Sequence, residues 1–67
     1  MSQINAIQNK QVRDFATACY DGNSINDLRI AVNSDADAID CRSWGITEIE
    51  WKQAINAALN DRLADEK

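Results

Sequence analysis

The side chains in this sequence that could perform chemistry are almost all carboxylates. Eleven aspartates and glutamates and two cysteines are present, and there is no histidine. Histidine is the usual general base near neutral pH, so its pairing with a serine or cysteine nucleophile is excluded within one chain. A chain of 67 residues also offers little volume for a substrate pocket. We therefore expect no enzymatic activity, no catalytic residue and no cofactor.

Three aspartates, Asp35, Asp37 and Asp40, are close enough in the sequence to suggest a cation site. A calcium-binding EF-hand loop needs glycine at its sixth position and glutamate at its twelfth. Counted from Asp35, those positions hold Asp40 and Ile46, so the pattern fails. Asp35 and Asp37 are explained more simply as acidic residues in the first turn of a helix, where the helix dipole favours negative charge. We expect no metal site.

The two cysteines, Cys19 and Cys41, do not have the spacing of a metal site. The first residues of the chain contain neither the basic start nor the apolar run of a signal peptide, so nothing indicates an oxidising compartment. No stretch approaches the length needed to span a bilayer. These features predict a cytoplasmic protein with two reduced, partly buried thiols and no contact with a membrane.

The formal charge of −4 is concentrated in the middle of the chain, where residues 21–40 contain five aspartates and one arginine. Affinity for nucleic acids depends mainly on neutralisation of phosphates by lysine and arginine. Direct binding of nucleic acid is therefore not expected. The same charge is suited to a basic protein partner, including a protein that itself binds nucleic acid.

The clearest structural pattern lies in residues 44–63 and predicts an amphipathic helix over 48–64. Thr47 is a favourable N-cap, and Glu50 three residues later completes a capping box. The apolar positions of this helix share one face: Trp51, Ala54, Ile55, Ala58 and Leu59, with Leu63 at its edge. Polar residues are expected on or toward the other side: Lys52, Asn56, Asn60 and Asp61.

Similar patterns predict three further helices, one long and two short: 3–20, 25–32 and 35–43. Ser24 and Ser34 are expected to cap the two short helices, each with an aspartate three residues later. There is no proline, and the sequence lacks the alternation that β-strands show. The chain is thus predicted to be a single all-α domain, 1–67, built as a small bundle of four helices.

The candidate core consists of the large apolar side chains on the inner faces of these helices: Ile4, Ile7, Val12, Phe15, Cys19, Ile25, Leu28, Val32, Ile39, Trp44, Ile46, Trp51, Ile55, Leu59 and Leu63. Burial of one such side chain contributes about 1.5–3 kcal/mol, but a chain this short loses nearly as much through ordering. Dimerisation would be an easy way to gain stability. Trp44 is expected to plug the core, although tryptophan is also enriched in binding hot spots. Ile49 lies off the inner face, so it either contacts the third helix or forms an exposed apolar patch.

The leading functional hypothesis is a small module that binds another protein through its acidic middle segment. The candidate contact residues are Asp27, Asp35, Asp37, Asp40 and Trp44. The aspartates would then imitate phosphates for a basic, nucleic-acid-binding target. Small size without a catalytic set also suits an accessory or inhibitor protein of a phage or mobile element.

Two alternatives remain open. Residues 25–43 have about the dimensions of a helix-turn-helix, which would make the chain a DNA-binding regulator that acts as a dimer. Its recognition helix would begin with Asp35-Ala36-Asp37, where acidic groups repel phosphates. The other alternative is a structural subunit whose apolar patch is buried in an assembly.

Overall fold

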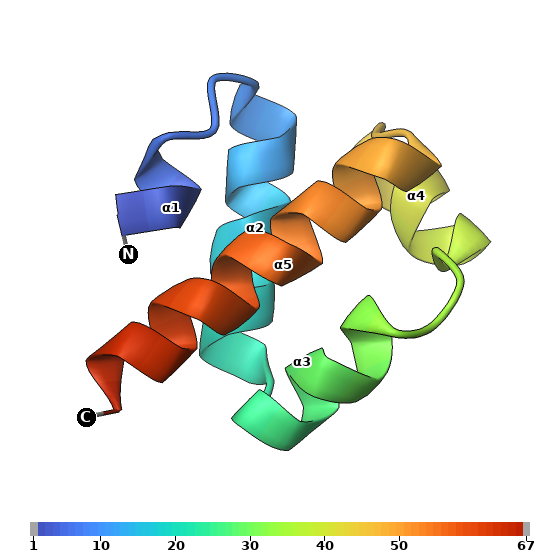
Figure 1. The fold of residues 1–67 in the computed structure, drawn as a ribbon. Helices are drawn as coiled ribbons and strands as arrows, with labels where there is room; N and C mark the ends of the chain where they lie inside the picture. Colours follow the sequence, from blue (N-terminus) through green and yellow to red (C-terminus); the bar gives the residue numbers. More distant parts are fainter. Residues whose placement is uncertain (1, 67) are drawn as a thin grey trace.

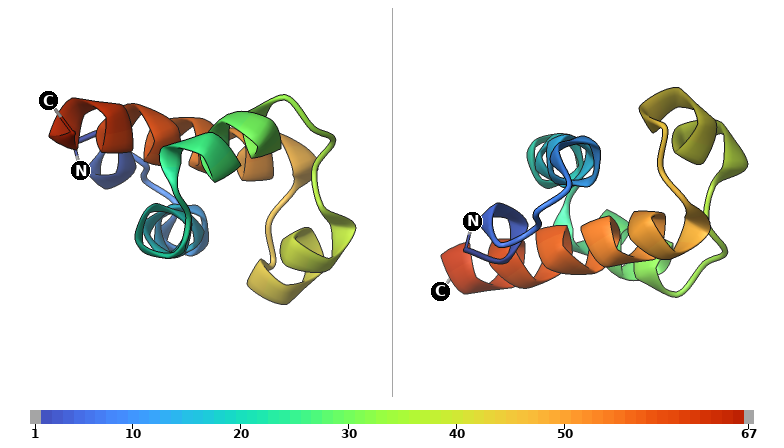
Figure 2. Two further views of the ribbon diagram at one scale, coloured as in Figure 1. Left: turned by 90° about the horizontal axis from the view of Figure 1, so that it is seen from below. Right: turned by 90° about the horizontal axis from the view of Figure 1, so that it is seen from above.

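Five helices make up the computed structural model, which describes residues 2–66, with side chains from Gln3 onward (Figure 1). They are α1 (Ser2–Asn5), α2 (Lys10–Gly22), α3 (Ile25–Val32), α4 (Ala38–Trp44) and α5 (Glu48–Asp65). α5 runs across the molecule, and each of the other helices packs against it. Two further views show α2 nearly end-on while α5 lies across the picture, so the two long helices cross steeply (Figure 2). The described range contains no strand, which confirms the all-α class.

Side-chain caps start α3 and α5 at the predicted residues. The Thr47 hydroxyl accepts a hydrogen bond from the Glu50 amide at 3.1 Å, and the Glu50 carboxylate accepts one from the Thr47 amide at 2.8 Å. Ser24 and Asp27 form the same reciprocal capping box at the start of α3. Each box satisfies two amides that would otherwise lack a partner. The capping boxes predicted at Thr47 and Ser24 are confirmed.

The predicted continuous helix over 3–20 is wrong, because residues 6–9 are not helical. Asn9 caps α2: its side-chain oxygen accepts hydrogen bonds from the amides of Gln11 at 2.9 Å and Val12 at 3.4 Å. The break contains neither glycine nor proline, and its local signal is the Asn9 cap. The bundle therefore has five helices instead of four, and the first of them is only four residues long.

The third predicted helix, over 35–43, begins later than expected. Ser34 does not cap it, because its hydroxyl donates a hydrogen bond to the carbonyl oxygen of Ile30 at 2.7 Å, in the last turn of α3. Asp37 takes the capping role, and its carboxylate accepts the amides two and three residues later at 2.8 and 3.1 Å. Residues 33–37 are thus a link rather than the start of a helix.

Most of the predicted core residues are buried: Ile4, Ile7, Val12, Phe15, Cys19, Leu28, Ile46, Trp51, Ile55 and Leu59. Ile25, Val32 and Trp44 are half-buried and pack against this core. Two expectations are wrong: Ile39 is 72% exposed on α4, and Leu63 is 38% exposed near the end of α5. α4 contributes no fully buried side chain and packs against the core through the half-buried Cys41 and Trp44, so Ile39 stays open to solvent.

The buried face of α5 is wider than predicted. Because α1, α2 and α3 all pack on this helix, Ala57 and Asp61 are buried in addition to the predicted apolar positions. The expectation that Asp61 faces the polar side is therefore wrong. Over residues 2–66, none of the helices combines the length and the apolar character that crossing a membrane would require.

Asp61 caps α1 from the opposite end of the chain. Its two carboxylate oxygens accept hydrogen bonds from the amides of Gln3 and Ile4, both at 2.9 Å, and the residue is only 2% exposed. Amides at the start of a helix have no partner within it, and a carboxylate also complements the positive end of the helix dipole. Since a four-residue helix is not stable alone, α1 depends on this contact and on the burial of Ile4.

Two cations of α5 cap the C-terminal ends of α2 and α3. Arg62 Nη1 donates to the carbonyl oxygen of Tyr20 at 3.0 Å, in the last turns of α2, and its guanidinium lies 5.4 Å from the centre of the Tyr20 ring. Lys52 Nζ donates to the carbonyl oxygen of Val32, the last residue of α3, at 2.8 Å. These carbonyls lie at the negative ends of their helices and lack partners there. α5 thus supplies both apolar contacts and polar caps to its neighbours.

Replacing Asp61 by asparagine should destabilise the fold, because an amide group offers one acceptor oxygen where the carboxylate uses two. We expect a loss of about 1–3 kcal/mol in the free energy of unfolding, measured by urea denaturation with tryptophan fluorescence. Asp35→Asn is the matched control, since Asp35 is exposed in a link, and its effect should stay within about 0.5 kcal/mol. Equal effects of the two substitutions would contradict the capping role.

Candidate protein-binding surface

Three of the predicted contact residues already have structural partners. Asp27 completes the capping box of α3, and Asp37 caps α4. Asp40 Oδ2 accepts a hydrogen bond from Trp51 Nε1 at 3.3 Å, which ties α4 to α5. Substituting any of these aspartates would therefore disturb the fold as well as the surface charge.

Trp44 lies at the edge of the core. Its ring centre is 5.5 Å from that of Phe15, with the two planes tilted by 54°. Phe15 in turn lies 6.5 Å from the ring of Trp51, so an aromatic cluster joins α2, α4 and α5. Trp44 is half-buried in this cluster, as expected for a residue that plugs the core. Its contact with a partner stays a prediction.

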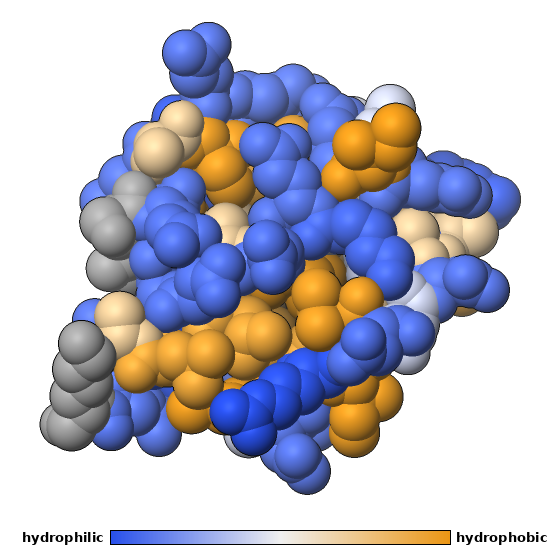
Figure 3. Space-filling view, viewed as in Figure 1, coloured by the Kyte–Doolittle hydropathy of each residue, from blue (hydrophilic) through white to orange (hydrophobic). Residues whose placement is uncertain are grey.

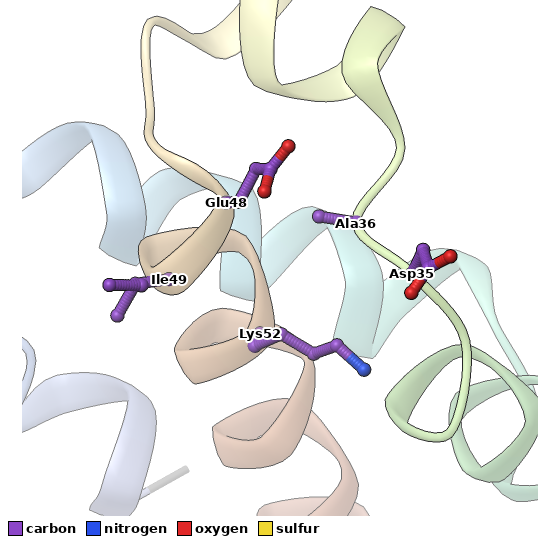
Figure 4. A pocket seen from close by; sticks show the side chains of 5 residues that line it. All are labelled: Asp35, Ala36, Glu48, Ile49 and Lys52. Carbon is purple, nitrogen blue, oxygen red and sulfur yellow. The ribbon is translucent and has the colours of Figure 1, made fainter.

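Asp35 differs from Asp27 and Asp37 because it is exposed without capping a helix. It is exposed in the link between α3 and α4, and this link faces the first turns of α5 across a hollow of about 610 Å³. The lining consists of Asp35, Ala36, Glu48, Ile49 and Lys52 (Figure 4). We call the surface formed by these residues the acidic rim. Its two carboxylates come from segments that are separate in the sequence.

The two sides of the acidic rim differ in chemistry (Figure 4). On one side the Lys52 chain extends toward the link that carries Asp35, and its amino group is held by the Val32 carbonyl. On the other side Ile49 points away from Asp35. Ile49 therefore borders the hollow, but its side chain projects to the side of α5 away from Asp35.

Ile49 is 82% exposed, so of the two predicted alternatives it is an exposed apolar side chain and not a buried contact of the third helix. At about 100° per residue, Ile49 lies on the side of α5 opposite the fully buried Ala58. The surface view shows other apolar area where α5 meets α3, on a face that is otherwise mostly hydrophilic (Figure 3). The large apolar side chains that are exposed elsewhere are Ile30, Ile39 and Leu63, at 63%, 72% and 38%.

The acidic character of this region acts on the Cys41 thiol. Its pKa is raised by removal from water, and then by the carboxylates of Glu48, Asp40 and Asp37 in decreasing order. Burial, with a smaller effect of Asp40, raises the pKa of the Cys19 thiol to about 11. Both cysteines are free thiols, and Cys41 is the more accessible one. Cys41 therefore serves as a natural reporter of the charge beside the acidic rim.

The sequence interpretation included Asp35 but missed Glu48, Ile49 and Lys52 as members of one surface. Glu48 is an acidic residue in the first turn of a helix, where it complements the helix dipole, so its position in the sequence does not by itself indicate a binding role. Only the folded chain brings the link at 33–37 beside the start of α5. Proximity across the fold, rather than residue type, defines this surface.

Comparison with protein-family models, curated proteins and solved structures finds no match to this chain. The interpretation of the acidic rim therefore depends on its geometry and charge. Across residues 2–66, histidine, cysteine and acidic side chains do not gather in any group of three or more that could hold a metal ion. What the rim offers chemically is two carboxylates and one ammonium group, which the Val32 carbonyl holds, beside an exposed aliphatic side chain.

Glu48→Gln should lower the pKa of the Cys41 thiol, because loss of a nearby negative charge makes the thiolate less unfavourable. More thiolate is then present at pH 8, so we expect Cys41 to react roughly two- to threefold faster with iodoacetamide. Rates are measured for each cysteine peptide by mass spectrometry, and Cys19 should stay slow in both proteins. Glu66→Gln, at the far end of α5, is the control and should leave the Cys41 rate unchanged. A Cys41 rate that does not respond to Glu48→Gln would contradict the electrostatic effect.

Proposed function

We propose that this protein binds a basic segment of another protein at the acidic rim. The observation that carries the proposal is the 82% exposure of Ile49 directly beside a hollow lined by Asp35 and Glu48. A partner that covers this position would bury an aliphatic side chain and pair with carboxylates at the same time, which are the two kinds of contact that a protein interface combines. The carboxylates add charge complementarity to a basic partner.

The geometry limits the shape of the partner. Because Ile49 and Asp35 lie on different sides of the first turn of α5, a partner that contacts both must span this turn. An aliphatic side chain would pack on Ile49, and a lysine or arginine would reach the carboxylates of Asp35 and Glu48. The aliphatic contact would contribute mainly to affinity, and the charges would contribute mainly to association rate and partner choice.

The proposed biological role is that of an accessory or inhibitor protein, of the kind that phages and mobile elements encode, acting on a basic and nucleic-acid-binding target. The net charge of −4 and the concentration of aspartates in residues 21–40 support a basic target. A carboxylate such as Asp35, which is exposed in the link between α3 and α4, can imitate a phosphate toward that target.

A protein partner is better supported than DNA. In a helix-turn-helix the two helices pack together and the second enters the major groove. Here α4 packs mainly against α2 and α5 rather than against α3, and Asp37 and Asp40 occupy its start. Carboxylates at that position would face phosphates. A gel-shift titration at low salt should show no complex with duplex DNA.

The test of the proposal compares two exposed isoleucines. The partner is first captured from native lysate on immobilised protein and purified, and its affinity is then measured by fluorescence anisotropy. Ile49→Ser should weaken binding about tenfold or more, because it removes the apolar contact while leaving the carboxylates in place. Ile30→Ser is the matched control, since Ile30 is 63% exposed on α3 and does not line the hollow.

A charge variant tests the second contact. Asp35→Lys should also weaken binding, and the effect should shrink as the salt concentration rises, because salt screens exposed charges. Neither Ile49→Ser nor Asp35→Lys should lower the thermal midpoint appreciably, since both side chains are exposed. Equal affinities of the Ile49→Ser and Ile30→Ser proteins would exclude the acidic rim as the binding surface.

A further inference from the structure

The break between α1 and α2 is held by contacts across the fold and by side-chain hydrogen bonds close to it. Residues 6–9 contain no glycine or proline, and no residue other than glycine in the described chain has a positive φ. The bend is instead held by side chains: Asp61 accepts the amides of Gln3 and Ile4, and Arg13 Nη1 donates to the Ile7 carbonyl at 3.1 Å. When the docking of α1 is absent, the Asn9 cap of α2 and the Arg13 hydrogen bond are the local contacts that keep residues 6–9 out of a helix.

The sequence of this region is that of one continuous amphipathic helix. Ile4 and Ile7 are three residues apart, so in a straight helix they share a face, and both are buried in the bent form. A continuous helix would also satisfy, within itself, the amides that Asn9 now accepts at the start of α2. The bend therefore gives up backbone hydrogen bonds of the link, and the docking of α1 on α5 compensates for them.

From these two observations we infer that α1 exchanges between two copies of this chain. The link at 6–9 straightens, residues 2–22 become one helix, and α1 of each copy docks on α5 of the other. The docked contacts are the same in both forms: Ile4 is buried and Asp61 accepts the amides of Gln3 and Ile4. Exchange of an identical element is a low-cost route to a dimer, because only the link and the association entropy change.

The site on α5 where α1 docks is complementary to α1, so α1 of a second copy can bind there. The docking site for α1 combines a buried carboxylate, whose two oxygens are 2.9 Å from two amides, with the fully buried side chain of Ile4. α1 of another copy has the complementary amides and isoleucine by definition. The exchanged form gains helix in the link and loses entropy on association. Because it is a dimer, its population must rise with protein concentration.

Cysteine cross-linking between copies tests the exchange directly. Gln3 Oε1 accepts a hydrogen bond from Asn60 Nδ2 at 3.1 Å, so these side chains report the docking of α1 on α5. In a background of Cys19→Ala and Cys41→Ser, a Gln3→Cys protein and an Asn60→Cys protein are mixed, incubated and oxidised. We expect a disulfide-linked heterodimer whose yield increases with concentration. A single chain carrying both cysteines is the positive control, and it should form an internal disulfide.

A variant in the link shifts the exchange without touching the docking site. Asn9→Ala removes the cap of α2 and favours a continuous helix. We expect the dimer association constant, measured by sedimentation equilibrium, to increase roughly tenfold or more. Asn9→Ser retains a capping oxygen and should behave like the original protein. The Gln3→Cys and Asn60→Cys mixture gives its answer even when Asn9→Ala is poorly folded.

Two results would overturn the inference. One is an internal disulfide in the positive control together with no heterodimer in the mixture at any concentration. The other is a dimer in sedimentation that yields no link between Gln3→Cys and Asn60→Cys, because such a dimer uses a different surface. Neither result bears on the acidic rim, which lies at the opposite end of α5, so the proposed function is tested separately.

Discussion

The hydrogen bonds from the amides of Gln3 and Ile4 to the Asp61 carboxylate are the contact on which the arrangement of this fold depends. They bring the beginning of the chain to the last turns of α5 and place a charged residue in the interior. A buried carboxylate is costly unless its oxygens are satisfied, and here each oxygen accepts a backbone amide. Because of this contact, α1 is a separate helix and the two ends of the chain are joined.

The same principle extends along α5. Arg62 binds a carbonyl near the end of α2, Lys52 binds the last carbonyl of α3, and Trp51 donates to Asp40 on α4. A chain of 67 residues has a small core and many helix ends, and each end carries polar groups without partners. α5 addresses both problems, since it buries apolar side chains and supplies polar caps to the helices around it.

Much of the acidity that suggests a function is used in this way. Asp27, Asp37 and Asp61 cap helices, and Asp40 holds the Trp51 indole. Asp35 differs because it caps no helix, although it is exposed like Asp27 and Asp37. The candidate surface is therefore smaller than the acidic middle segment, and it includes part of α5. Structural and functional acids have similar sequence signals, since a helix dipole and a basic partner both favour negative charge.

The sequence by itself determined the all-α class, the start of α3 and α5, and most of the core. These features depend on interactions within four residues or on a repeating apolar face: Thr47 with Glu50, Ser24 with Asp27, and Trp51 with Ile55. Local interactions of this kind can be read from spacing alone.

Only the tertiary structure decided the docking of α1 on α5, the burial of Asp61 and the position of Ile49 and Asp35 around one hollow. Each of these depends on groups that are distant in the sequence, such as Ile4 and Asp61, which are 57 residues apart. Spacing carries no information about such pairs. The late start of α4 has a local cause: Ser34 and Asp37 are both good capping residues, but the Ser34 hydroxyl donates to the Ile30 carbonyl of α3, and Asp37 caps α4.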